Sequence, residues 1–393
     1  MEYLNNRLPK GLIALFTAKT ILMAASGLLG LFLPIFLYKL FGNNFQYAML
    51  YYGVSSLIYA LLVPLGALYL YKFGFRNALF MSSIWGALFY VAFYFTNVEN
   101  AFYLIPLSIL ILTLNRICYW LPYHVDFAIL TNKSERGKQF SVFESTRNIL
   151  SGLIPILSGF LVARFGFDSI FAIAVILFAA SSFSYLKVPR TNEVYSWSYK
   201  QTWQEFFHKK NRKTVFAFMA DGAEGIVGMI VWPIFIYELL KGDILQVGIL
   251  SSLIIVVTVI AQIALGKYID KKKENKEGIL KWGSSLYSIG WVFKIFIFTA
   301  FHIFVVGVYH NLMKIFLRTP FDVLTYEIAA DQGHYVDEFT VMHEMAIHFG
   351  KVLAVISAII LSLFLPLQWT FGLAALAAIS FNLLRSKHAF HKI

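Results

Sequence analysis

The chain has 393 residues, of which 59% are hydrophobic, 18% aromatic and only 14% charged. This composition excludes a soluble globular protein and is typical of a protein with many membrane spans. The formal net charge of +12 does not indicate nucleic-acid binding, because the basic residues are dispersed among loops and form no single basic face. The lone cysteine, Cys118, excludes a disulfide framework within the chain.

The first apolar segment follows a basic flank, Arg7 and Lys10, and contains an Ala-Ala-Ser-Gly sequence that resembles a signal-peptidase site. Its apolar run continues to residue 40, which is too long for a cleaved signal peptide, so we expect an uncleaved first span. A span needs about 20 apolar residues, and twelve segments meet this requirement. In chain order they are 11–40, 45–70, 77–96, 101–130, 140–163, 169–187, 213–240, 244–266, 279–299, 301–328, 339–364 and 368–385.

The distribution of Lys and Arg predicts the orientation of these spans, because the cytoplasmic loops of membrane proteins collect basic residues. With the N-terminus inside, the cytoplasmic segments hold 23 Lys and Arg residues, whereas the opposite ends hold only Lys39, Arg164 and Lys241. Both termini are therefore expected in the cytoplasm. We expect Lys294, near the end of a span, to extend its long side chain to the membrane interface. The other seven basic residues lie inside the predicted spans. They are Lys19, Arg116, Arg147, Lys294, Lys314, Arg318 and Lys351.

An internal repeat divides the chain into two similar halves. The sequence PIFLYKL at 34–40 recurs as PIFIYEL at 233–239, which predicts a duplicated unit of six helices. We therefore expect one six-helix bundle over 1–188, a second over 213–393, and a cytoplasmic linker over 189–212. The linker forms either a short interfacial helix or a solvated loop; its aromatic residues at helical spacing are Tyr199, Trp203, Phe206 and Phe207.

With these features the chain resembles the major facilitator superfamily over its whole length. The family has a loop motif, G-x-x-x-D-[RK]-x-G, after the second span of each half, and the second copy here reads GKYIDKK, with Gly266 and Asp270 at its glycine and aspartate. The first copy, GALYLYKFGFR, has Leu70 in place of the aspartate, so we do not carry the family's gate contact over to that loop. In the fourth span Arg116 matches the family's arginine, but Trp120 replaces its glycine.

The resemblance implies an all-α membrane protein with twelve transmembrane helices in two pseudo-symmetric six-helix bundles. It also implies alternating access around a central cavity lined by the first, fourth, seventh and tenth spans. The charged residues inside the spans lie mainly on these four segments. They are Lys19 on 11–40, Arg116 on 101–130, Asp221 and Glu224 on 213–240, and Lys314, Arg318 and Asp322 on 301–328.

A charge at mid-membrane costs from about 3 kcal/mol upward, so such residues normally face water, an ionic partner or a substrate. We expect Asp221 and Glu224 to be counter-ions and proton carriers, and the alternative is a hydrated position near the inner mouth. Small residues between and beside them, Gly222, Gly225 and Gly228, would let a neighbouring helix or a ligand approach the backbone.

Helical periodicity places Arg116 on one stripe with Trp120, Tyr123 and Phe127. Aligning Pro122 with Pro320 superposes Arg116 on Lys314, so the two halves are expected to present equivalent cations to the cavity. The alternative is a structural ion pair that locks two helices. The residues expected to bind the solute are Arg116, Trp120, Tyr123, Lys314 and Arg318.

A second group of charged residues is expected near the cytoplasmic surface. Arg116 lies about 21 Å from the nearest cytoplasmic loop along its helix, too deep to pair with Glu144 or Arg147 in the first turns of the next span. We therefore expect these two residues to form an inner gate with others at the same depth. The predicted gate residues are Gly266, Asp270, Asp126, Glu144, Arg147 and Glu344.

The sequence HEMAIH resembles a zinc-binding motif, but His343 and His348 are five residues apart. They lie about 140° out of register on a helix, unlike the two histidines of H-E-x-x-H. We therefore expect no metal and no other cofactor. The chain also has no G-x-x-x-x-G-K-[ST] phosphate loop and no sizeable soluble domain, which excludes an ATP-driven pump contained in it.

These features favour a non-enzymatic secondary transporter that moves a small organic solute. We expect a monomer in the cytoplasmic membrane that moves the solute with protons as coupling ion. An anionic or zwitterionic solute is favoured, because the expected central cations outnumber Asp221 and Glu224. Drug/proton efflux is the alternative supported by the segment GLIPILSG at 152–159, which partly matches a pattern of exporters in the family. An intramembrane metalloenzyme and a non-transporting receptor are the alternatives from other classes.

Overall fold

The computed structural model describes residues 10–130, 136–190, 195–269, 276–331 and 336–384. Some side chains within the described helices are not described, among them those of residues 127–130 and 136–145. The described part of the chain is helical and contains no strand. This is the expected result for a chain in an apolar medium, where each backbone N–H and C=O needs a partner within its own segment.

In the described residues of its first half, the chain forms seven helices. The first predicted span is divided at Leu31 into α1 and α2. Two of the connections are very short, because Gly74 (φ 74°) and Gly166 (φ 81°) adopt the left-handed backbone conformation that ends one helix and begins the next. In order, the helices are α1 (Lys10–Gly30), α2 (Phe32–Leu40), α3 (Phe45–Phe73), α4 (Phe75–Tyr94), α5 (Ala101–Leu130), α6 (Arg136–Phe165) and α7 (Phe167–Tyr185).

The second half repeats this order. Its first span is also interrupted, here by the π-helical turn η2, where the PIFIYEL repeat begins just after the interruption. The elements are α9 (Arg212–Ile226), η2 (Val227–Val231), α10 (Trp232–Leu239), α11 (Ile244–Ile269), α12 (Lys276–Ile295), α13 (Ala300–Asp331), α14 (Val336–Ser362), η4 (Leu367–Thr370), α15 (Phe371–Ser380) and η5 (Phe381–Leu383).

Ten of the described helical segments are long and apolar enough to cross a membrane. Two of the twelve predicted spans are not among them. The segment α12 has 20 residues but includes Lys276, Glu277, Lys281 and Lys294, and Leu367–Leu383 is a shorter apolar helix. The all-α membrane fold is therefore confirmed, whereas the number of twelve crossings stays a prediction.

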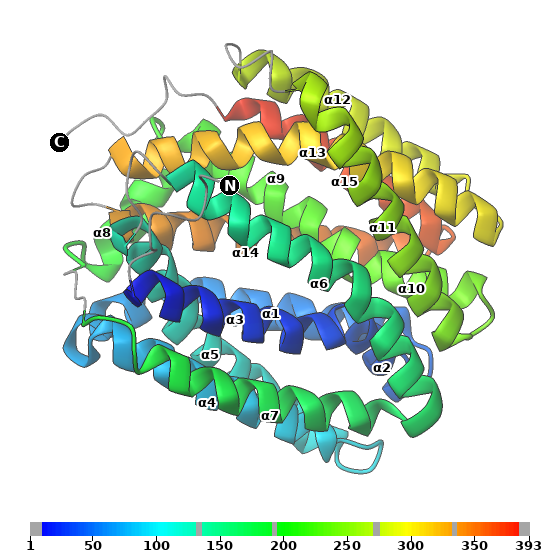
Figure 1. Ribbon diagram of the computed structural model, residues 1–393, viewed down its shortest axis with the longest axis horizontal. Helices are drawn as coiled ribbons and strands as arrows, with labels where there is room; N and C mark the ends of the chain where they lie inside the picture. Colours follow the sequence, from blue (N-terminus) through cyan, green and yellow to red (C-terminus); the bar gives the residue numbers. More distant parts are fainter. Residues whose placement is uncertain (1–9, 131–135, 191–194, 270–275, 332–335, 385–393) are drawn as a thin grey trace.

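The helices form two bundles that lie one above the other in Figure 1. In the first bundle α4 packs against α5 and α7, and α1 packs against α6 and α7; in the second, α12 packs against α13 and α15, and α9 against α14 and α15. Two long contacts join the bundles, α6 with α11 and α3 with α14. These contacts leave the helices that carry the intramembrane charges facing one another across the centre.

The contact of α9 with α14 depends on two glycines. A Cβ atom on Gly222 would lie 1.8 Å from the carbonyl oxygen of Ile347, and one on Gly350 would lie 1.8 Å from that of Met219. The backbones of the two helices therefore approach more closely than any residue with a side chain permits. Gly222 was predicted to allow such an approach, and the structure shows it.

The linker between the halves contains the short helix α8 (Tyr199–Phe207), at the left of Figure 1; we call this end of the bundles the linker end. Trp203 and Phe206 contact the ring of Phe349 in α14, each with a centroid distance of 5.7 Å, while Phe207 is exposed. Just before α8, Ser196 donates its backbone N–H to Glu338 Oε1 of α14 at 2.7 Å. The helical form of the linker, one of the two alternatives for this segment, is thus the one observed.

Candidate functional site

A cavity of about 710 Å³ lies between the two bundles. Residues of α1, α5, α9 and α13 line it, which are the helices assigned to a cavity by the resemblance, and α3, α4 and α14 contribute as well. The lining holds five basic and three acidic side chains. They are Lys19, Arg116, Arg147, Arg318 and Lys351, and Asp221, Asp322 and Glu344.

Arg116 lies in α5 and faces α3. Its guanidinium donates a hydrogen bond of 3.1 Å to Ser55 Oγ and lies 5.8 Å from the centroid of the Tyr59 ring. Among the described residues no carboxylate lies within ion-pair distance of it. A guanidinium has five N–H donors in a planar fork, so a hydroxyl group and an aromatic face leave most of its binding capacity available to a ligand.

Aromatic side chains of α5 surround the ammonium group of Lys19. The Nζ atom donates to Tyr119 Oη at 2.5 Å and lies 4.8 Å from the ring centroids of Tyr119 and Trp120 and 4.3 Å from that of Tyr123. Cation–π attraction stabilises this arrangement. Trp120 and Tyr123, both predicted as solute-binding residues, line the cavity, whereas the side chain of Phe127 lies outside the described set.

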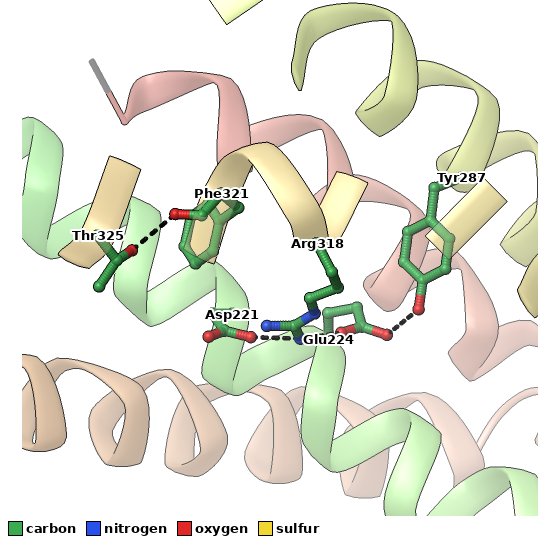
Figure 2. A network of polar contacts seen from close by, with 6 residues as sticks. All are labelled: Asp221, Glu224, Tyr287, Arg318, Phe321 and Thr325. Carbon is green, nitrogen blue, oxygen red and sulfur yellow. Dashed lines mark hydrogen bonds and ion pairs between the residues drawn. The ribbon is translucent and has the colours of Figure 1, made fainter. Parts of the chain in front are cut away.

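Arg318 of α13 holds two carboxylates of α9 (Figure 2). Its Nη2 lies 2.5 Å from Asp221 Oδ1 and 3.1 Å from Glu224 Oε2. Tyr287 of α12 donates a second hydrogen bond to Glu224, at Oε1 and 2.5 Å. Asp221 and Arg318 line the cavity, while Glu224 is only 2% exposed. The predicted counter-ions thus meet a cation, and that cation is Arg318.

Lys314 and Arg318 are four residues apart on one face of α13. Arg318 lines the cavity, whereas Lys314 is exposed and is not among its lining residues. Lys314 interacts electrostatically with Glu224, Arg318 and Asp221, so it lies beside the same charged group. The expected pairing of Arg116 with Lys314 across the cavity stays a prediction.

Lys294 also differs from its expected position. Its side chain is 3% exposed and its Nζ lies 3.8 Å from the ring centroid of Trp291 and 4.1 Å from that of Trp232. It is therefore buried within the second bundle and does not extend to the membrane interface. The burial depends on α10, which supplies Trp232 opposite α12.

The helix α14 brings a further polar group to the cavity. Glu344 accepts a hydrogen bond of 3.1 Å from Tyr59 of α3. The ring of His348 lies 4.5 Å from that of Tyr59, and its Nε2 is 3.4 Å from Lys351 Nζ. Glu344 was predicted to belong to a cytoplasmic gate, whereas here it lines the cavity, on the contact between the two halves.

The other predicted gate residues are described only in part, so their grouping stays a prediction. Asp126 is fully buried in α5, and Arg147 of α6 is exposed and lines the cavity. Gly266 lies in the last turn of α11, before its end at Ile269. The side chain of Glu144 and the whole of Asp270 lie outside the described residues.

The histidines of HEMAIH point to different neighbours. The ring of His343 contacts that of Phe218 at a centroid distance of 4.3 Å, whereas His348 packs on Tyr59. Within the ranges that the structure describes, no group of three or more His, Cys, Asp or Glu side chains is placed to hold a metal ion.

Several residues around the cavity were not predicted from the sequence. Ser55 and Tyr59, the partners of Arg116, are uncharged residues of an apolar helix and gave no signal. Lys351 did give a signal in the sequence, because it is a basic residue inside a predicted span. Tyr287, which binds Glu224, would have required knowledge of how α12 packs against α9.

The sequence profile of the Major Facilitator Superfamily matches residues 15–330 of the chain. Among solved structures, the peptide transporter POT in complex with sulfate has a TM-score of 0.66 and 12% identity, covering 95% of this chain and 93% of that one. A POT family transporter in complex with 5-aminolevulinic acid has a TM-score of 0.66 and 12% identity, with 95% of each chain covered. Likeness at this identity shows the fold alone. No curated protein matches the sequence significantly.

Proposed function

The chain belongs to the major facilitator superfamily, and we propose that it is a secondary active transporter of a small organic anion or zwitterion. In this proposal it works in the cytoplasmic membrane by alternating access, with protons as the coupling ion. Solved transporters of the same fold are described in complex with sulfate and with 5-aminolevulinic acid. These ligands are an anion and an amino acid, so they support the same class of solute through the fold only.

The proposed class of solute rests on the contacts of Arg116. Its guanidinium lines the cavity and binds a neutral hydroxyl group, while Arg318 is already neutralised by Asp221 and Glu224. A cation inside a membrane span without a carboxylate at ion-pair distance is unfavourable, so an anionic group that enters the cavity stabilises it. The planar fork holds a carboxylate or phosphate group through two hydrogen bonds, which lysine does not match.

Proton coupling is proposed for Asp221 and Glu224 because they share one cation. Two carboxylates around one guanidinium carry a net charge of −1, and uptake of a single proton makes the group neutral. Like charges at close range favour such an uptake. An anionic solute that competes for Arg318 would favour it further, which links solute binding to protonation.

The orientation follows from the basic residues of the loops. We propose that the linker end is cytoplasmic, with one bundle over 1–188, the linker over 189–212 and the second bundle over 213–393. At the opposite end, Tyr38 of α2 donates a hydrogen bond to Glu238 of α10. The cavity lining reaches Ala329 and Val336, at the linker ends of α13 and α14, so the cavity is proposed to open towards the cytoplasm in this state.

Purified protein in proteoliposomes tests the function. A panel of organic anions, zwitterions and lipophilic cations would first be screened by thermal shift, and the stabilising compounds would then be tested for uptake with and without a pH gradient. We expect accumulation of an anion or zwitterion that requires the gradient. Movement of lipophilic cations alone would favour the drug-efflux alternative, and binding without any flux would favour a receptor.

A further inference from the structure

The buried ammonium group of Lys294 has no carboxylate at ion-pair distance in the described part of the chain. Trp291 and Trp232 hold it between their rings, at centroid distances of 3.8 and 4.1 Å. A charged lysine in such a place is costly, because two aromatic faces replace its hydration only in part. Glu224 is the nearest candidate, since it interacts electrostatically with Lys294.

The π-helical turn η2 aligns Glu224 with Trp232. The two residues are eight positions apart, which in a regular α-helix would set them about 80° apart around the axis. A π-helical turn accommodates one extra residue, so the spacing becomes equivalent to seven positions, about 20° from perfect register. Glu224 and Trp232 therefore point to the same side of the helix, towards α12 and Lys294. Turns of this kind occur frequently at functional sites.

Glycine at position 228, within η2, brings the carboxylate close to the aromatic clamp. A Cβ atom at Gly228 would lie 3.5 Å from the ring of Trp291 and 3.8 Å from Glu224 Oε1. The carboxylate oxygen and the tryptophan that holds Lys294 therefore border the same small space. Arg318 binds the other oxygen, Oε2, from the cavity side. Glu224 thus lies between two cations, one that lines the cavity and one that is buried.

We propose that Lys294 is a positioning residue that becomes the cationic partner of Glu224 when Arg318 moves to the solute. The inference rests on the proposed function in one respect, the solute that draws Arg318 away. With Lys294 present, Glu224 keeps its negative charge after Arg318 leaves, so the proton taken up by the pair goes to Asp221. Without Lys294, the carboxylate would be left in a medium of low dielectric and would take up a proton instead.

The other titratable groups around this pair do not replace Lys294. Tyr287 hydrogen-bonds Glu224 from α12, and His310 and Lys314 interact electrostatically with Lys294 from α13. The described helix α15, FGLAALAAIS, carries no charge. Lys314 also interacts electrostatically with Glu224, but its side chain is exposed, whereas Lys294 is buried.

A double-mutant cycle on purified full-length protein tests the pair without any transport assay. Lys294→Met, Glu224→Gln and the double variant would be compared by melting temperature. In the Glu224→Gln background we expect Lys294→Met to lower the melting temperature by less than about half as much as it does in the wild-type protein. The interaction between the two side chains has already been removed in that background. Lys39→Met is the matched control, since Lys39 also lies over an aromatic ring, that of Phe167 at 5.7 Å, but at the opposite end of the molecule. Equal losses from Lys294→Met in both backgrounds would overturn the proposal.

The pH dependence of uptake separates a role in charge from a role in packing. Lys294→Met should shift the pH at which uptake is half-maximal upward by about one unit, and Lys294→Arg should restore it. An unshifted pH profile in a well-folded Lys294→Met protein would also overturn the proposal. If the wild-type protein transports nothing, the proposed function fails, while the double-mutant cycle still decides whether Lys294 and Glu224 act together.

Discussion

The phenol of Tyr59 in α3 donates a hydrogen bond of 3.1 Å to Glu344 in α14 and so joins the two halves of the molecule beside the cavity. Both side chains are buried. Removing the hydroxyl group in Tyr59→Phe leaves a buried carboxylate without this donor, which costs about 1 to 3 kcal/mol. We expect a lower melting temperature, and Tyr69→Phe, an exposed position of the same helix, should leave it unchanged. Equal melting temperatures for the two variants would mean that the contact contributes nothing.

The close approach of α9 and α14 gives a second prediction. Gly222→Ala places a methyl group 1.8 Å from the carbonyl oxygen of Ile347, whereas Gly225→Ala on the same helix meets nothing within 4 Å. We expect the first variant to lose about 1 to 3 kcal/mol of stability through overpacking. The second should be neutral or slightly stabilised, because alanine favours a helix over glycine. Melting temperatures of the two purified proteins check this, and a Gly222→Ala protein as stable as wild type would contradict the described contact.

The membrane orientation can be tested with single cysteines in a Cys118→Ser background. A cysteine at Lys200 in α8 should be protected from an impermeant thiol reagent in intact cells, because the linker end is proposed to be cytoplasmic. One at Asn97, in the exposed connection between α4 and α5 at the opposite end, should be labelled. The reverse labelling pattern would invert the proposed topology.

Proton coupling predicts a difference between two transport modes. Asp221→Asn or Glu224→Gln, whichever removes the proton carrier, should abolish accumulation driven by a pH gradient. Exchange of solute at equal concentrations should continue, because it requires no net proton movement. Both modes would be measured in the same proteoliposomes. If neither variant changes the pH dependence, α9 has no part in the coupling.

The overall fold could be predicted from the sequence because its signals are local. Apolar length marks the spans, Lys and Arg mark the loops, and PIFLYKL and PIFIYEL mark the two halves. The break at Leu31 and the turn η2 were not predicted, since no local sequence pattern marks them. The contacts of Glu224 with Tyr287 and of Trp232 with Lys294 join helices that are far apart in the sequence.

The site was predictable only in part. Charge inside the spans identified Arg116, Asp221, Glu224 and Arg318, all of which the structure brings to the cavity or its border. Sequence spacing did not distinguish Lys314 from Arg318. The partners that other helices supply were not predictable either, because they depend on which helices pack together in the folded chain. Lys294 shows this most clearly, since its place near the end of α12 suggested the interface while the tryptophans around it bury it.

The central claim is that Arg116 binds the solute, and ligand affinity with thermal stability in the same variants tests it most directly. For a compound that stabilises the wild-type protein, we predict that Arg116→Lys folds normally but binds about tenfold more weakly, equivalent to about 1.4 kcal/mol, because it loses the planar fork. Arg164→Lys, an exposed residue in the last turn of α6, should bind normally. If Arg116→Lys keeps full affinity and only Arg116→Ala loses thermal stability, Arg116 is a structural residue and the claim is contradicted.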